Sequence, residues 1–178
     1  ADAQGVVRVA TGDVTGDETP ESVTALGRGL SPWISVSDSQ GNALAKFRAF
    51  DPSFQGGVNV AIGDVNGDGV MDIVVGMRAG KIKGGSQVAV FLTTVASDHS
   101  VSFAPYKAPF APFGTRFTGG VTVAVADMGT FSNGKTLNRN TLDGRAEIIV
   151  ANESAMRSTV KVFDYSGAKP KAVRTFLP

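Results

Sequence analysis

The sequence predicts an all-β fold built from three similar units, each with four short β-strands. Two observations support this prediction. Strand-like runs rich in β-branched residues recur in groups of four along the 178 residues. The first run of each group is also followed by the same type of acidic loop. Four-stranded units that repeat with a matched loop are typical of β-propeller blades, so the chain is predicted to form three blades, half or part of a propeller.

The strand positions follow from local residue patterns. Val58-Asn59-Val60-Ala61-Ile62 alternates as a strand does, and Ile73-Val74-Val75 is a β-branched run typical of a buried strand. Corresponding runs divide the chain into predicted blades at residues 1–55, 56–118 and 119–178. In chain order, the expected strands are 6–11, 21–26, 33–38 and 44–50, then 58–63, 72–77, 86–94 and 101–107, then 121–126, 146–151, 158–164 and 171–176.

The second unit carries a stretch with the ligand spacing of a calcium loop. Asp64, Asn66 and Asp68 stand at positions one, three and five, where alternate side chains of a tight loop point inward. The main-chain carbonyl of Val70 takes position seven and the carboxylate of Asp72 takes position nine. Ca2+ prefers six to eight oxygen ligands at about 2.3–2.6 Å. The spacing therefore predicts a Ca2+ site formed by these five residues.

Two other interpretations of this stretch compete with the calcium loop. An EF-hand loop begins in the same way, but it needs a glutamate at position twelve and a helix on each side. Position twelve here is Val75, inside a predicted strand, so the loop is expected to join two strands. A β-hairpin turn also favours Asp, Asn and Gly for conformational reasons alone. Carboxylates crowded into one turn repel each other without a cation, which favours the metal.

The same loop recurs twice in weaker form. In the first copy Thr15 is a poorer ligand than asparagine, and Glu18 replaces a glycine at position six. In the third copy an insertion at residues 128–142 interrupts the loop, either as a functional surface loop or as a tolerated insertion in a degenerate blade. The candidate metal ligands of the first copy are Asp13, Thr15, Asp17, the carbonyl of Thr19, and Glu21, and those of the third copy are Asp127, Asp143 and Glu147.

With these residues in place, the chain resembles the FG-GAP repeats of integrin α-subunit propellers and the related VCBS repeats of bacterial surface proteins. The likeness is strong in the calcium loop and the strand after it, and weak at the letters of the family name. Gly56-Gly57 stands where Phe-Gly is expected, and Gly76 alone remains of Gly-Ala-Pro. The resemblance implies a calcium loop between the first two strands of a blade. It also implies ligand binding by blade loops on one face, and hence binding or adhesion.

Composition narrows the function further. The formal net charge is +1 and the basic residues are scattered, so nucleic-acid binding is not expected. No run of about 20 apolar residues is present, and no membrane span is expected. The chain has no cysteine, which excludes disulfides and is ordinary for a bacterial surface protein stabilised by Ca2+. A secreted or cell-surface location in a bacterium is therefore expected.

The sequence offers little material for an active site, and no enzymatic activity is expected. The single histidine, His99, lies in a polar turn, and Asp38 and Asp164 are expected to be turn residues rather than a carboxylate pair. Trp33 and Tyr165 are candidate sugar-stacking platforms, although blade packing is the more ordinary role of such a tryptophan. The stretch from Phe103 to Phe117 alternates aromatic residues with prolines and is expected to be a long link between the second and third blades.

Three blades are fewer than the four to eight that close a propeller. The end blades of an open arc expose apolar faces, so we expect a partner to cover them. The partner is either a second copy that closes a six-bladed ring or further blades of a larger protein, and a protein or glycan ligand is possible in addition. The favoured function is a calcium-binding, non-catalytic binding or adhesion module. The alternatives are a lectin-like propeller and an accessory segment of a polysaccharide-degrading enzyme.

Overall fold

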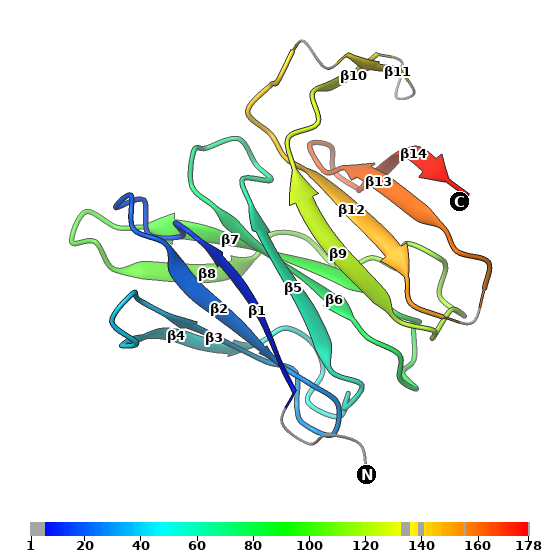
Figure 1. Cartoon of the computed structure of the whole chain (residues 1–178), viewed down its shortest axis with the longest axis horizontal. Coiled ribbons are helices and arrows are strands. Elements are labelled where there is room, and N and C mark those ends of the chain that lie inside the picture. Colours follow the sequence, from blue (N-terminus) through cyan, green and yellow to red (C-terminus); the bar gives the residue numbers. More distant parts are fainter. Residues whose placement is uncertain (1–5, 133–135, 139–140, 155, 178) are drawn as a thin grey trace.

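The computed structural model describes residues 6–132, 136–138, 141–154 and 156–177. Within these ranges the chain forms fourteen β-strands and no helix. The strands make three antiparallel four-stranded sheets and one two-stranded hairpin (Figure 1). The all-β prediction is therefore confirmed. The described part of the chain contains no helix with the length and apolar character needed to cross a bilayer.

Each sheet uses four strands that follow one another in the sequence, apart from the hairpin inserted into the third. The first sheet has the order β1 (Val7–Gly12), β2 (Glu21–Leu26), β3 (Trp33–Ser37) and β4 (Ala43–Arg48). The second has β5 (Val58–Gly63), β6 (Asp72–Met77), β7 (Val88–Val95) and β8 (Val101–Pro105). The third has β9 (Val121–Ala126), β12 (Glu147–Asn152), β13 (Val160–Asp164) and β14 (Lys171–Phe176), and the hairpin has β10 (Thr130–Ser132) and β11 (Thr136–Asn138).

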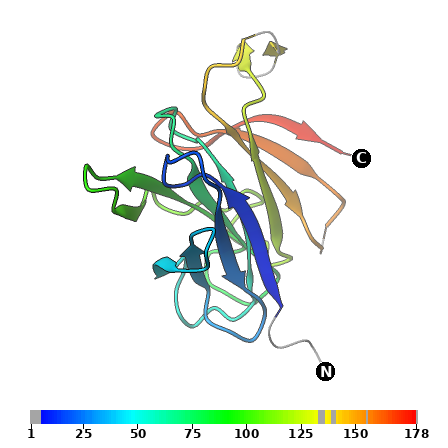
Figure 2. The same cartoon turned by 60° about the vertical axis from the view of Figure 1, so that its left-hand side comes forward.

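The sheets stack like blades around a common axis. Their first strands, β1, β5 and β9, lie side by side, with β5 between the other two (Figures 1 and 2). The later strands of each sheet fan outward from these three. The stack is an open arc and does not close into a ring. The structure thus agrees with a partial propeller, because each sheet has a blade's strand order and the sheet at each end lacks a neighbour on one side.

The second sheet is covered on both faces, which explains the composition of its strands. In β6 the side chains of Ile73, Val75 and Met77 pack toward the first sheet, whereas Val74 packs toward the third. Every residue of β6 is buried. A strand with two covered faces needs apolar side chains at successive positions and not only at alternate ones. This is why the sequence has an uninterrupted β-branched run here.

The link between the second and third sheets is part of the core. After β8 the chain continues along β7 in the same direction. The N–H of Tyr106 donates to the carbonyl of Val90, and Phe110 pairs with Val88. The ring of Phe110 lies 5.0 Å from that of Phe163 in an edge-on contact. The predicted link is confirmed, and its aromatic side chains join the core between the two sheets.

The surroundings of Tyr165 and Trp33 bear on their candidate role as sugar-stacking platforms. Tyr165 is only 2% exposed and packs against Tyr106 and Phe110, so it is not available to stack on a sugar, and that possibility was wrong. Trp33 is half-buried on the outer side of the first sheet. Its ring already carries the guanidinium of Arg48 at 4.3 Å and the ammonium of Lys46 at 5.1 Å. Both cations lie over the indole ring, which is the surface on which a sugar would stack.

Candidate metal-binding loops

The loop between β5 and β6 folds around the carboxylate of Asp64. Oδ1 of Asp64 accepts the N–H groups of Gly67 at 2.6 Å and Asp68 at 3.2 Å, and Oδ2 accepts that of Gly69 at 2.8 Å. Gly67 and Gly69 have φ angles of 78° and 86°, which are favourable only for glycine. The loop therefore curls around its own first residue, and glycine is the residue that adopts the required backbone angles at both positions with the least strain.

The other two loops repeat this arrangement. In the first, Oδ2 of Asp13 accepts the N–H of Glu18 at 2.8 Å, which is the bond that Gly69 makes in the second loop. In the third, Oδ2 of Asp127 accepts the N–H of Gly144 at 3.0 Å. The insertion thus leaves the loop before its closing hydrogen bond and returns to complete it. Figure 1 shows the three loops along one edge of the stack, with the β10–β11 hairpin projecting from the third.

The carboxylate at position nine makes an equivalent bond in every copy. It accepts the N–H of the residue at position two, with Val65 donating to Asp72 Oδ2 at 3.0 Å. The first loop has the same bond from Val14 to Glu21 Oε2 at 2.9 Å, and the third has it from Met128 to Glu147 Oε2 at 2.9 Å. All three carboxylates are buried. The matching bonds show that the three loops share one local fold, although only the second has an uninterrupted sequence with glycines in both places.

These position-nine carboxyls are difficult to ionise in the folded chain. Burial raises the pKa of Asp72 from its ordinary 3.8 to about 6, and the negative charges of Asp68 and Asp64 add to the increase. Burial also raises the pKa of Glu147 to about 7, with a contribution from Asp143 and Asp127. Among the ion pairs described, none joins a cationic side chain to Asp72 or Glu147.

Glu21 shows the same direction in the first loop. Burial raises its pKa, and the charges of Asp17 and Asp13 raise it further. For Asp13 burial alone would also raise the pKa, but four backbone N–H groups in the loop together lower it. The loop backbone thus stabilises the ionised form of Asp13, whereas burial and nearby negative charges disfavour the ionised form of Glu21.

The position-five aspartates are exposed in all three loops. Asp68 Oδ1 accepts the N–H of Val70 at 2.9 Å, and equivalent bonds run from Thr19 to Asp17 and from Arg145 to Asp143. The position-three side chain of Asn66 donates to Asp68 Oδ2 at 2.8 Å. These contacts tie the position-five carboxylate to the backbone at position seven in all three loops, and in the second loop also to the side chain at position three.

Two observations bear on whether these residues can bind a cation, and they point in opposite directions. Among the residues that the structure describes, no three acidic or histidine side chains converge closely enough to form a metal-binding cluster. The loop carboxylates instead accept backbone N–H groups, as they would in a turn that binds nothing. The donor set nevertheless suits Ca2+, because it consists of hard oxygen ligands.

The second loop also contacts the neighbouring sheet. The carbonyl of Asp64 accepts the N–H of Ala146 at 2.6 Å, and the side chain of Arg145 lies against Gly67. A polar cleft of about 250 Å3 opens beside this contact. One of the residues that line it is Tyr165, whose buried hydroxyl has no hydrogen-bond partner among the described residues. The residues that line the cleft are Val65, Thr130, Asp143, Arg145, Ala146, Glu147, Asp164, Tyr165 and Ser166.

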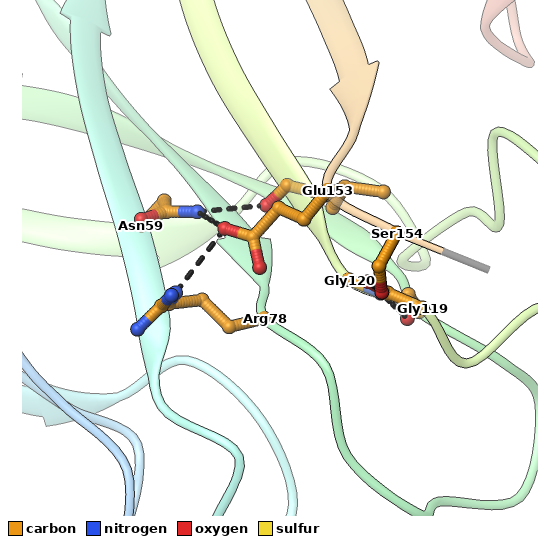
Figure 3. A network of polar contacts seen from close by, with 8 residues as sticks. Asn59, Arg78, Gly119, Gly120, Glu153 and Ser154 are labelled. Atoms are coloured by element: carbon orange, nitrogen blue, oxygen red, sulfur yellow. Dashed lines mark hydrogen bonds and ion pairs between the residues drawn. The ribbon is translucent and has the colours of Figure 1, made fainter. Parts of the chain in front are cut away.

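The opposite edge of the stack holds a polar contact that sequence patterns did not indicate (Figure 3). The side-chain amide of Asn59 donates to the carbonyl of Val121 and to Oε1 of Glu153, both at 2.8 Å. Arg78 Nε lies 3.1 Å from the same Glu153 oxygen. The three side chains come from two different sheets, so no spacing in the sequence could have revealed the contact. It joins the second and third sheets at the end remote from the loops.

The remaining polar residues singled out in the sequence form turns. The N–H groups of Gln40 and Asn42 donate to Asp38 Oδ1, and the N–H of Ser166 donates to Asp164 Oδ1. His99 is exposed in a turn and has a φ angle of 64°. Asp164 also lines the polar cleft that contains Asp143 and Glu147. The turn predictions are confirmed.

Comparison with known protein families identifies one segment of the chain. Residues 56–91 match the model of the FG-GAP repeat. This segment runs from the Gly-Gly pair before β5 to the middle of β7 and includes the whole second loop. No curated protein matches the chain.

Proposed function

We propose that this chain, which contains an FG-GAP repeat at residues 56–91 within a partial β-propeller, is a calcium-binding and non-catalytic binding or adhesion module. FG-GAP repeats occur in extracellular or surface proteins, which supports an exported or cell-surface location. Export into a medium rich in Ca2+ suits a cysteine-free chain whose loops have calcium-ligand spacing. A bacterial surface protein is the source that we favour.

The observation that carries the calcium part is the shared geometry of the three loops. In each, a first-position aspartate binds the loop backbone, and a buried ninth-position carboxyl lies near further acids. A divalent cation would remove the repulsion between these charges and favour the ionised form of the buried acid. The ligands of the second site are Asp64, Asn66, Asp68, the carbonyl of Val70, and Asp72. The first and third loops supply the corresponding oxygens with weaker ligand sets.

The ion in this proposal stabilises a strand connection and does not take part in chemistry. Each loop joins the first two strands of its sheet, and the residues at position two of the first two loops, Val14 and Val65, are buried in the two cores between sheets. Fixing the loop therefore fixes a residue that the neighbouring sheet packs against. Ligands of the module would be bound by loops at the surface of the stack, and either a protein or a glycan is compatible with this role.

The test is a pair of thermal melting curves, one with Ca2+ and one with a chelator, repeated with Mg2+ as a control for ionic strength. A ligand that binds only the folded state must raise the melting temperature, and saturation a hundredfold above Kd adds about 2.7 kcal/mol. We expect a clear increase with Ca2+ and a smaller one with Mg2+. Identical curves in Ca2+ and chelator would refute the calcium part, and turnover of a polysaccharide would refute the non-catalytic part.

A further inference from the structure

The two end sheets each leave one face without a neighbour in the described chain. On the first sheet, Arg8 and Ala10 pair with the core residues Ala25 and Val23. The alternate residues of β1 therefore point to the open side, where Val7 is 45% and Val9 is 59% exposed. An apolar, β-branched strand that faces outward in this way is unusual for a surface that meets only water.

The open side of the third sheet carries small side chains along its first strand, whereas that of the first sheet carries valines. Val121, Val123 and Val125 of β9 pack into the core toward the second sheet. The residues between them, Thr122, Ala124 and Ala126, point to the open side and are exposed. This innermost strand therefore presents small side chains, beside the half-buried Ile149 and Ala151 of β12 and Val160 of β13, which the strand registers place on the same face.

The two interfaces inside the stack show how such faces fit together. At each one, the later sheet inserts a β-branched side chain against a glycine of the earlier sheet. Ile62 of β5 lies against Gly12 of β1, where an added Cβ would be 3.1 Å from Ile62 Cγ2. Val125 of β9 lies against Gly63 of β5, where an added Cβ would overlap its side chain. Large residues on one face thus meet small residues on the next.

The open faces carry the two halves of this same interface. By position in the repeat, Val7, Val9 and Thr11 of β1 correspond to Val58, Val60 and Ile62 of β5. Ala124 and Ala126 of β9 correspond in turn to Ala61 and Gly63 of β5. One end therefore offers the β-branched side, and the other end offers the small-residue side. The complementarity holds between the two ends of the chain and not between two copies of the same end.

We propose that a second copy of this chain docks its first sheet on the open face of the third sheet, and that two such contacts close a six-bladed ring. A two-fold axis makes both contacts identical, and six blades lie within the range in which propellers close. The proposal follows from the partial-propeller architecture and does not depend on calcium binding. In this dimer, the contact between the two chains repeats the two sheet-to-sheet contacts that are already present within one chain.

The chemistry of both faces indicates a reversible contact. Away from β1, the open side of the first sheet carries hydroxyl groups, including those of Thr24 and Ser35, which pair across β2 and β3. Ala126 also carries a Cβ where Gly12 and Gly63 have none, so the new contact must be slightly wider than the internal ones. A partly polar and less tightly packed interface is typical of subunits that also exist apart.

Sedimentation velocity across the micromolar range tests the ring, with each sample run in Ca2+ and in chelator. We expect the native chain to approach twice its monomer mass. Val9→Lys and Ala124→Glu should each weaken association by about tenfold or more, which is about 1.4 kcal/mol or more per dimer. A matched control is Leu142→Lys, because Leu142 is 68% exposed and lies outside all three sheets. It should associate like the native chain.

Mixing the two variants distinguishes the ring from other dimers. A mixed ring has one native contact and one contact in which the lysine introduced by Val9→Lys meets the glutamate introduced by Ala124→Glu, so association should recover in the mixture. If Ala124→Glu dissociates the dimer and Val9→Lys does not, the third sheets pair with each other and the ring is refuted. A native chain that stays monomeric throughout the concentration range also refutes it. Circular dichroism of both variants checks that each remains folded. Failure in these experiments leaves the calcium melting test unaffected.

Discussion

Replacing Asp72 by asparagine gives opposite effects in chelator and in Ca2+ if the second loop binds the ion. The side chain is fully buried, with Oδ1 accepting the N–H of Thr93 at 3.1 Å and Oδ2 that of Val65 at 3.0 Å. Asparagine has nearly the same shape but only one oxygen. The substitution therefore removes a buried charge and also leaves one buried N–H without its acceptor.

The size of the effect in chelator follows from these two changes. Raising the pKa of Asp72 from 3.8 to about 6 corresponds to a cost of about 3 kcal/mol for the ionised form at pH 7. An unpaired buried N–H costs about 1–3 kcal/mol. The variant should therefore range from unchanged to about 2 kcal/mol more stable than the native chain without metal. In saturating Ca2+ the native chain gains about 2.7 kcal/mol or more that the variant loses.

The pH dependence in chelator has a defined sign. Because the folded-state pKa of Asp72 is raised above its unfolded value, the folded chain holds more protons between pH 3.8 and about 6. The contribution of protonated Asp72 to stability is therefore present at low pH and is lost as the pH rises through this interval. The asparagine variant lacks this group, so its stability relative to the native chain should increase over the same interval. Ca2+ should reverse the trend for the native chain, because it binds the ionised form.

Urea unfolding at several pH values, in chelator and in Ca2+, measures all of these quantities. Asp38→Asn is the matched control, since Asp38 also accepts two backbone N–H groups but lies in a turn of the first sheet away from the loops. Its effect should be the same with and without Ca2+. If Asp72→Asn lowers the free energy of unfolding equally under both conditions, Asp72 is only a structural acceptor and the reasoning is refuted.

Three further sets of substitutions probe the loops and the contacts between sheets. Glu18 has a φ angle of 66° where Gly69 and Gly144 have 86° and 75°, so Glu18→Gly should stabilise the chain by about 0.5–1 kcal/mol in urea unfolding. Glu18→Ala should show no such gain, and equal effects of the two would contradict an origin in the backbone angle. Gly63→Ala should destabilise by about 1–3 kcal/mol, because its Cβ would overlap Val125 across the sheet interface. Unchanged thermal stability of that variant would show that the sheets are not packed this closely. The Arg78–Glu153 pair, with side chains 30% and 21% exposed, should give a coupling energy of at most about 1 kcal/mol in a double-mutant cycle. Asn59→Leu should cost about 1–3 kcal/mol, because it removes the donor to the Val121 carbonyl, and a smaller loss than that of Arg78→Ala would contradict this ranking.

Features that depend on neighbouring residues could be predicted from the sequence. The alternation in Val58–Ile62 and the β-branched run in Ile73–Val75 place β5 and β6, because side-chain direction along a strand has a period of two. The loop between them is recognisable for a similar reason. Its oxygen-bearing side chains are spaced along one tight curve, and glycines stand where the backbone requires a positive φ.

Other features could not be predicted because they arise between segments that are far apart in the chain. Tyr165 is a candidate exposed aromatic residue by sequence but is buried by Tyr106 and Phe110 from the link. The contact of Asn59 with Glu153 crosses from one sheet to another. The insertion at 128–142 suggests a disrupted third loop, yet Gly144 still closes it by donating to Asp127.

The sequence by itself determined the three four-stranded units, the phase of the repeat and the nine-residue acidic loops, because strand alternation and ligand spacing are local properties. Only the tertiary structure decided which faces are covered, which carboxyls are buried and which ends remain open. Those outcomes depend on how the sheets stack, and stacking is controlled by the fit of large side chains such as Ile62 and Val125 against Gly12 and Gly63. The sequence contains those residues, but only the folded stack brings each pair into contact.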